Sequence, residues 1–176
     1  GKGVTIAFLD SGFYPHEDLT KPNNRIIGYR SLIHSDGDLT SLFQADVASW
    51  HGMMTSVVAA GNGSLSNGFY RGIAPEADLV LVKLARTGRI TDENIREGLE
   101  WVLANRDRFK IGIVNISAGG DEEKSYLGDP LSRVVEACTA AGILVVCAVG
   151  NSGHLPDHPV VPPASAPSCI AVGGLD

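Results

Sequence analysis

The sequence predicts an α/β fold in which a doubly wound, mostly parallel sheet carries helices on both faces. Five apolar segments of six or seven residues, rich in β-branched side chains, have the character of strands buried inside a parallel sheet. These segments alternate along the chain with segments of helical periodicity, which is the pattern of strand–helix–strand units. The 21 glycines suit the tight turns that such units require.

Individual strands and helices can be assigned from this periodicity. The expected strands are residues 4–9, 78–84, 111–117, 143–149 and 169–174. The expected helices are residues 51–60, 91–109 and 129–142. Thr91 is placed to cap the second of these helices, and Pro130 to occupy the first position of the third. Residues 15–50 and 61–77 are polar and rich in Gly, Asn and Asp, so we expect loops with short local structure there.

The composition limits the class of protein. With 44% hydrophobic and 19% charged residues, the 176-residue chain suits one globular domain with a sizeable core. A net charge of −6 without any run of Lys or Arg argues against nucleic acid or an acidic membrane as a partner. No apolar stretch reaches the roughly 18 residues of a membrane-spanning helix. Cys138, Cys147 and Cys169 are odd in number and lie in apolar runs, which indicates buried core residues rather than disulfides or a zinc site.

Three polar residues lie at or just beyond the ends of expected strands. Asp10, Ser117 and Asn151 each follow an apolar run, and ligands of open parallel sheets bind beyond the carboxyl ends of the strands. A carboxylate at Asp10 is partly buried and needs a hydrogen-bond donor, for which an imidazole is suitable. His51 opens an expected helix, where the positive end of the helix dipole favours a neutral ring that can act as a base. These residues are therefore expected to converge on one site.

The segments around these residues also suit peptide chemistry. The side-chain amide of Asn151, within the run GNSG, can donate to a developing negative oxygen. Ser117 leads into Ala118-Gly119-Gly120, a small and glycine-rich edge against which an extended peptide can pair backbone to backbone.

Taken together, these motifs resemble those of the subtilisin-like serine peptidases, the subtilases. The matching runs, in the family's order, are DSG (10–12), HG (51–52), IAPEADLVLVKL (73–84), NISAGG (115–120) and AVGNSG (148–153). The resemblance implies a serine endopeptidase with an Asp-His-Ser catalytic triad and an oxyanion hole. It implies that Asp10 orients the base, that His51 is the general acid and base, and that Asn151 stabilises the oxyanion. It also implies two sets of substrate-binding residues, Ser117, Ala118 and Gly119 along the substrate backbone, and Ala148, Val149 and Gly150 around the side chain that precedes the scissile bond.

The resemblance carries further expectations. The run VVPPASAPSCIAV resembles a family segment with a cis proline, which predicts a cis bond before Pro163. No cofactor is required, although Asp18 matches a position that can serve a structural calcium ion in the family. The partners expected are a peptide or protein substrate, with no nucleic acid and no membrane. Family habit favours secretion, whereas the three cysteines and the lack of a signal peptide leave the cytoplasm open.

The departure with the largest consequence is the nucleophile. The family carries it in a Gly-Thr-Ser motif, and this sequence contains none. We therefore expect residues 1–176 to be the N-terminal portion of a single subtilase catalytic domain, incomplete at both ends and inactive alone. A companion segment with the Gly-Thr-Ser motif is expected to supply the serine.

The sequence was also open to other classes of function, which fit it to different degrees. The alternative is a non-catalytic subtilase-like domain that binds peptides or acts as a scaffold, and an accompanying Gly-Thr-Ser segment would distinguish the two. A nucleotide-binding domain fits poorly, because the glycine-rich run 61–68 follows a helix and lacks the phosphate-loop Lys-Ser/Thr. A phosphoryl-transfer domain built on Asp10 also fits poorly, since no second carboxylate lies nearby at metal-ligand spacing.

Overall fold

Parallel strand pairing organises the chain from its first strand to its last. The computed structural model describes residues 1–33, 39–85, 89–120, 122–155 and 157–174. Within these residues six strands form one sheet in the order β2-β3-β1-β4-β5-β6, and all neighbouring strands are parallel. The strands are β1 (Thr5–Asp10), β2 (Ile26–Ser31), β3 (Asp78–Lys83), β4 (Ile111–Ile116), β5 (Leu144–Ala148) and β6 (Ile170–Val172). The predicted α/β class is confirmed.

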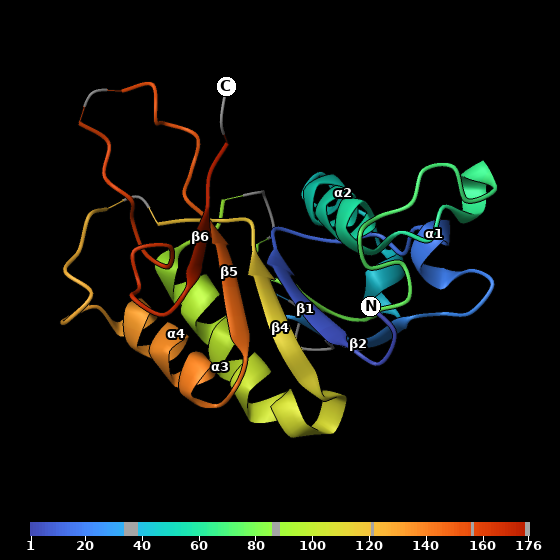
Figure 1. The fold of residues 1–176 in the computed structure, drawn as a ribbon, viewed down its shortest axis with the longest axis horizontal. Helices are drawn as coiled ribbons and strands as arrows, with labels where there is room; N and C mark the ends of the chain where they lie inside the picture. The colour runs from blue at the N-terminus through green and yellow to red at the C-terminus, as the bar shows by residue number, and fades with distance from the viewer. Residues whose placement is uncertain (34–38, 86–88, 121, 156, 175–176) are drawn as a thin grey trace.

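Helices lie on both faces of this sheet (Figure 1). The α-helices are α1 (Glu17–Thr20), α2 (Ser49–Ala60), α3 (Asp92–Phe109) and α4 (Pro130–Ala140), and the short 3-10 helices are η1 (Ser41–Phe43) and η2 (Ser64–Ser66). Helices α3 and α4 pack side by side on one face, and α2 covers the opposite face at β1. Of the helices in the described ranges, none is long and apolar enough to cross a membrane.

Two hydrophobic cores follow from the alternation of side chains along the strands. In β1, Ala7 and Leu9 join the core under α3 and α4, whereas Ile6 and Phe8 join the core on the α2 face. Leu9 and Phe8 are at most 1% exposed. Burying one such side chain stabilises the fold by about 1.5–3 kcal/mol, so both cores fix the sheet between its helices.

The helix ends confirm the capping signals in the sequence. The Thr91 side chain accepts a hydrogen bond from the backbone N of Asn94, and Oδ1 of Asn94 accepts one from the backbone N of Thr91. Asp129 caps α4 by accepting a 2.7 Å hydrogen bond from the backbone N of Ser132, and Pro130 is the first helical residue.

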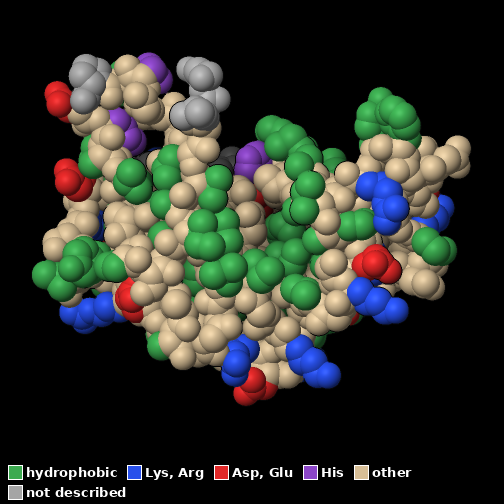
Figure 2. Space-filling view, viewed as in Figure 1, with side chains coloured by type: hydrophobic (Ala, Val, Ile, Leu, Met, Phe, Trp, Pro, Cys, Tyr) green, Lys and Arg blue, Asp and Glu red, His purple; other side chains and the backbone are tan. Residues whose placement is uncertain are grey.

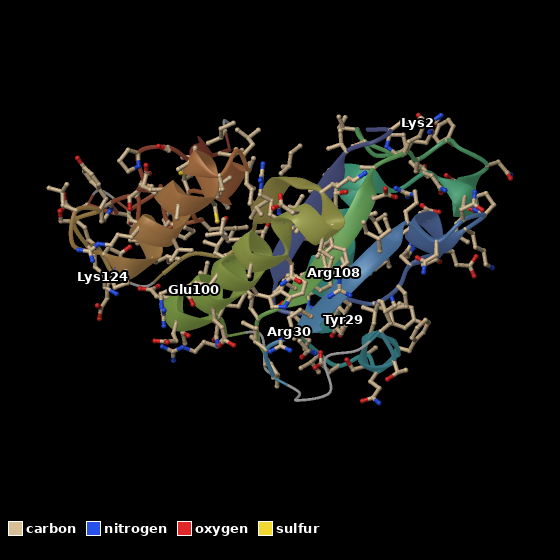
Figure 3. The ribbon with its side chains drawn as sticks, turned by 90° about the horizontal axis from the view of Figure 1, so that it is seen from below. Lys2, Tyr29, Arg30, Glu100, Arg108 and Lys124 are labelled. Atoms are coloured by element: carbon tan, nitrogen blue, oxygen red, sulfur yellow. The ribbon has the colours of Figure 1, made fainter. Side chains whose placement is uncertain are left out.

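Two local expectations need correction. Strand β2 lies inside the segment 15–50 that was expected to form loops. Its Gly28 interrupts the apolar pattern, but a Cβ there would lie 3.0 Å from the ring of Phe109, so the packing of α3 against this edge requires the small residue. Figure 3 shows Tyr29 and Arg30 of β2 at this edge, close to Arg108 near the end of α3.

The second correction concerns α2, which begins at Ser49, so His51 is its third residue rather than its first.

Among the described residues, no helix covers β5 and β6 on the α2 face of the sheet. In β5, Val145 and Cys147 are fully buried beneath α4, while Leu144 on the opposite face is 44% exposed. Ile170 and Val172 of β6 are about half exposed, and Figure 2 shows hydrophobic side chains gathered over β5 and β6. The result is an apolar surface on β5 and β6, which we call the open sheet face.

Helix α2 approaches β1 very closely through a residue that has no side chain. A Cβ on Gly52 would lie 2.2 Å from the carbonyl oxygen of Gly12 and 2.9 Å from the Cβ of Asp10. Both distances are shorter than van der Waals contact. Glycine at this position therefore sets how near the first turn of α2 comes to the end of β1.

The three cysteines, all within the described ranges, are free thiols. Cys138 and Cys147 are fully buried in the core beneath α4, as the sequence predicted. Burial raises the pKa of the Cys138 thiol to about 11, and burial together with the neighbouring Cys169 thiol raises the pKa of Cys147 further.

We expect Gly52→Ala to destabilise the folded chain by about 1–3 kcal/mol, because the added methyl group pushes α2 away from β1. Urea denaturation of the variant beside the unchanged protein measures this cost. Gly112→Ala is the matched control, since a Cβ at Gly112 meets nothing within 4 Å. An equal and small effect of both substitutions would show that the approach of α2 is not constrained at Gly52.

We expect Cys138 and Cys147 to resist alkylation by iodoacetamide at pH 8 in the native protein, because the attacking thiolate is both scarce and buried. In denaturant both should react as ordinary thiols, which peptide mass spectrometry of the digest would detect. The raised pKa of Cys138 also lowers stability as pH rises from about 9 towards 11, since only the unfolded thiol ionises in that range. Rapid native alkylation of Cys138 would contradict its burial.

Candidate active site

Asp10 and His51 are joined by a short hydrogen bond across 41 residues of sequence. Asp10 ends β1 and is 1% exposed, and its Oδ1 lies 2.7 Å from Nδ1 of His51. The same carboxylate accepts a 2.7 Å hydrogen bond from the backbone N of Ser11 and a 3.2 Å bond from Oγ1 of Thr55. Hydrogen bonds from three residues thus compensate the burial of this carboxylate.

This arrangement determines which nitrogen of the imidazole is free for chemistry. A carboxylate only accepts hydrogen bonds, so the proton in the bond between Asp10 and His51 is assigned to Nδ1. In the neutral ring Nε2 then carries a lone pair. The side chain of His51 is 36% exposed, so this nitrogen can serve as a base toward a group outside the core.

A hollow of about 330 Å³ adjoins this pair at the place where the strand order reverses. Strands β2 and β3 follow β1 on one side of the sheet, and β4 and β5 extend it on the other, so the switch lies between β1 and β4. Ligands of such sheets bind at this point, beyond the carboxyl ends of the strands. The hollow is lined by Asp10, Ser11, Trp50, His51, Ile90, Ser117, Ala118 and Gly119.

A second hollow, of about 260 Å³, shares Gly119 with the first. Its lining residues are Gly119, Gly120, Ala148, Val149, Gly150, Asn151, Ser152, His158 and Val161. All nine predicted site residues therefore lie around one or the other hollow, Asp10 and His51 in the first and Asn151 in the second. The bond between Pro162 and Pro163, close to this second hollow, is cis as predicted.

The structure adds residues that the sequence did not single out. Thr55 shares the face of α2 with His51, and its position four residues later could have revealed its contact with Asp10. Trp50 packs edge-on against the His51 ring, with ring centroids 5.4 Å apart. Ile90 and Val161 enter the two hollows from separate segments, and no local pattern marks them.

Asp18, the predicted candidate for a calcium ligand, is buried and already engaged. Its Oδ1 accepts a 2.8 Å hydrogen bond from the backbone N of Leu65, which ties α1 to η2. In the part of the chain that the structure describes, no group of three or more His, Cys, Asp and Glu side chains is placed to hold a metal ion. This contact gives Asp18 a structural role.

Comparison with solved structures agrees with this architecture. The CspB protease of Clostridium perfringens superimposes with a TM-score of 0.72 over 86% of this chain and 37% of that protein, at 21% identity. Sphericase superimposes with a TM-score of 0.65 over 97% of this chain and 53% of that protein, at 24% identity. At these identities the likeness shows the fold.

Sequence comparison extends the likeness to the family. Serine protease AprX of Bacillus subtilis is 39% identical over the whole of this chain, which covers 39% of AprX. Subtilisin BL of Lederbergia lenta is 32% identical over the whole chain, which covers 57% of that protein. The chain thus spans about half the length of these relatives or less. The family model described as the subtilase family matches residues 1–176, and the chain belongs to this family of serine proteases.

Proposed function

We propose that this chain carries the Asp and His of a serine endopeptidase triad, with the serine supplied by a segment outside the chain. The observation that carries the proposal is the 2.7 Å hydrogen bond between Asp10 and Nδ1 of His51 beside a hollow at the switch point of the sheet. Residues 1–176 then form the N-terminal portion of a single catalytic domain.

The proposed chemistry is acyl transfer from a peptide bond. Nε2 of His51 takes the proton of the serine hydroxyl as the oxygen attacks the scissile carbonyl, and then donates that proton to the leaving amine. Asp10 keeps the ring in the Nδ1–H form and stabilises the imidazolium that forms during attack. The buried hydrogen bonds from Ser11 and Thr55 support this role, because they fix the orientation of the Asp10 carboxylate.

The two hollows are proposed to hold the substrate. The segment Ser117-Ala118-Gly119 lies between them, and its small side chains leave space for an extended peptide to pair with its backbone. Ala148, Val149 and Gly150 then surround the side chain that precedes the scissile bond. The Asn151 amide, in the same hollow, is proposed to donate to the oxyanion of the tetrahedral intermediate.

Two observations favour a nucleophile on a companion segment. The Ser11 hydroxyl in the hollow beside His51 is engaged, because Ser11 Oγ donates to the carbonyl of Ala48 at 2.9 Å. The open sheet face also exposes Leu144 and Ile170 in a continuous apolar surface. We propose that the companion segment, carrying a Gly-Thr-Ser motif, packs on this face and completes the site.

In the assembled protease we expect Asn151→Ala to lower kcat by about 10²–10³-fold with little change in KM. That loss is typical of removing one oxyanion donor, for which the subtilisins are the standard example. The amide stabilises charge that exists only in the transition state, so ground-state binding is little affected. Steady-state kinetics on a peptide substrate give both constants, with the exposed Asn23→Ala as control. A rise in KM at constant kcat would assign Asn151 to substrate binding instead.

A serine-directed fluorophosphonate probe tests the two-segment proposal. We expect no labelling of residues 1–176 alone, and labelling of the companion segment once both are mixed. His51→Ala should abolish labelling and peptide hydrolysis, whereas His154→Ala, which changes an exposed histidine, should leave both intact. Labelling of this chain by itself would refute a separate nucleophile. Peptide binding without labelling of either segment would favour the non-catalytic alternative.

A further inference from the structure

Lys83 is a buried cation on the face of the sheet that carries the proposed base. It is the last residue of β3 and is 4% exposed. Its strand neighbour in register is Asp10 of β1. Leu79 and Leu81 of β3 belong to the core on the α2 face, so the alternation of side chains places Lys83 on that face as well. A buried ammonium group requires an anionic partner.

That partner is Asp46, three residues before α2 begins. Nζ of Lys83 donates to Oδ2 of Asp46 at 2.5 Å. The other oxygen, Oδ1, accepts hydrogen bonds of 3.0 Å from the backbone N of Ala48 and from Oγ of Ser49. The carboxylate therefore joins the end of β3 to the beginning of α2.

The electrostatics of Asp46 support a permanent link. Burial acts to raise the pKa of Asp46, but hydrogen bonds from Lys83 and Ser49 and the charge of Lys83 outweigh it, so the pKa is lowered. The carboxylate thus stays ionised at neutral pH. Phe43 and Val47, near Asp46 in sequence, are 68% and 80% exposed, whereas Ala48 is buried and its carbonyl accepts the hydrogen bond from Ser11 Oγ.

We propose that Lys83 and Asp46 are positioning residues, whose ion pair holds the first turn of α2 so that His51 keeps Nδ1 on Asp10. His51 lies only two residues beyond Ser49, which Asp46 binds directly. The proposal rests on the function proposed above. A buried ion pair often adds little net stability, so its effect is expected in the geometry of this turn rather than in folding alone.

Lys83→Met and Asp46→Asn test the pair in the assembled protease. Each variant should lower kcat of the folded fraction by about 10–100-fold, because a displacement of the base by about 1 Å has effects of that size. KM should change less than about twofold, since neither residue lines the two hollows. The double variant should lose no more than the more severe single variant, because both act through one contact. Lys21→Met, which removes an exposed 3.0 Å pair with Glu17, is the matched control.

A second measurement separates this proposal from the proposed function. The Nδ1–H proton of His51 should give a low-field NMR signal without substrate, which His51→Ala assigns. Lys83→Met and Asp46→Asn should shift or broaden this signal, and Lys21→Met should not. If the assembled protein hydrolyses no peptide, the proposed function fails, and this signal still decides the positioning role. An unchanged signal in both folded variants, or a lower Tm with unchanged kcat, would overturn it.

Discussion

The close approach of the first turn of α2 to the end of β1 is the constraint on which the rest of the site depends. It exists because Gly52 has no Cβ, and an added Cβ would lie 2.2 Å from the carbonyl oxygen of Gly12. The approach brings the imidazole of His51 within 2.7 Å of a carboxylate that is otherwise buried at the end of a strand. Asp10 in turn needs this donor, since burying an unpaired carboxylate is costly. The packing at Gly52 and the hydrogen bonding of Asp10 therefore both require α2 to lie this close to β1.

The two faces of the sheet are covered differently. Helices α3 and α4 seal one face with a continuous core, which fixes the relative positions of β1, β3, β4 and β5. The other face is covered at β1 by α2 and left apolar and exposed over β5 and β6. Because the strand order reverses between β1 and β4, the polar residues of both halves meet at one edge. The second hollow reaches Ala148 at the end of β5, the strand whose exposed face we propose is covered by a further segment.

Two carboxylates hold the beginning of α2 in different ways. Asp10 binds a ring that is proposed to gain and lose a proton during each turnover. Asp46 binds the ammonium group of Lys83 and has a lowered pKa, so this link keeps its charge at neutral pH. The proposed proton-transfer pair is thereby linked to a turn that the Asp46 carboxylate holds. The arrangement agrees with the general need of active sites for rigid support of the reacting groups.

The sequence by itself determined most of the elements, the cap at Thr91, and the motifs at Asp10 and His51, because apolar periodicity, capping and short motifs are local properties. The sequence did not reveal β2, which lies at the edge of the sheet. Its Gly28 interrupts the apolar pattern, and this glycine lies against Phe109 at the end of α3. Only the tertiary structure decided that Lys83 meets a carboxylate 37 residues away and which side chains line the hollows. Such contacts depend on the order of the strands and on the depth at which α2 packs, and no short stretch of sequence encodes either.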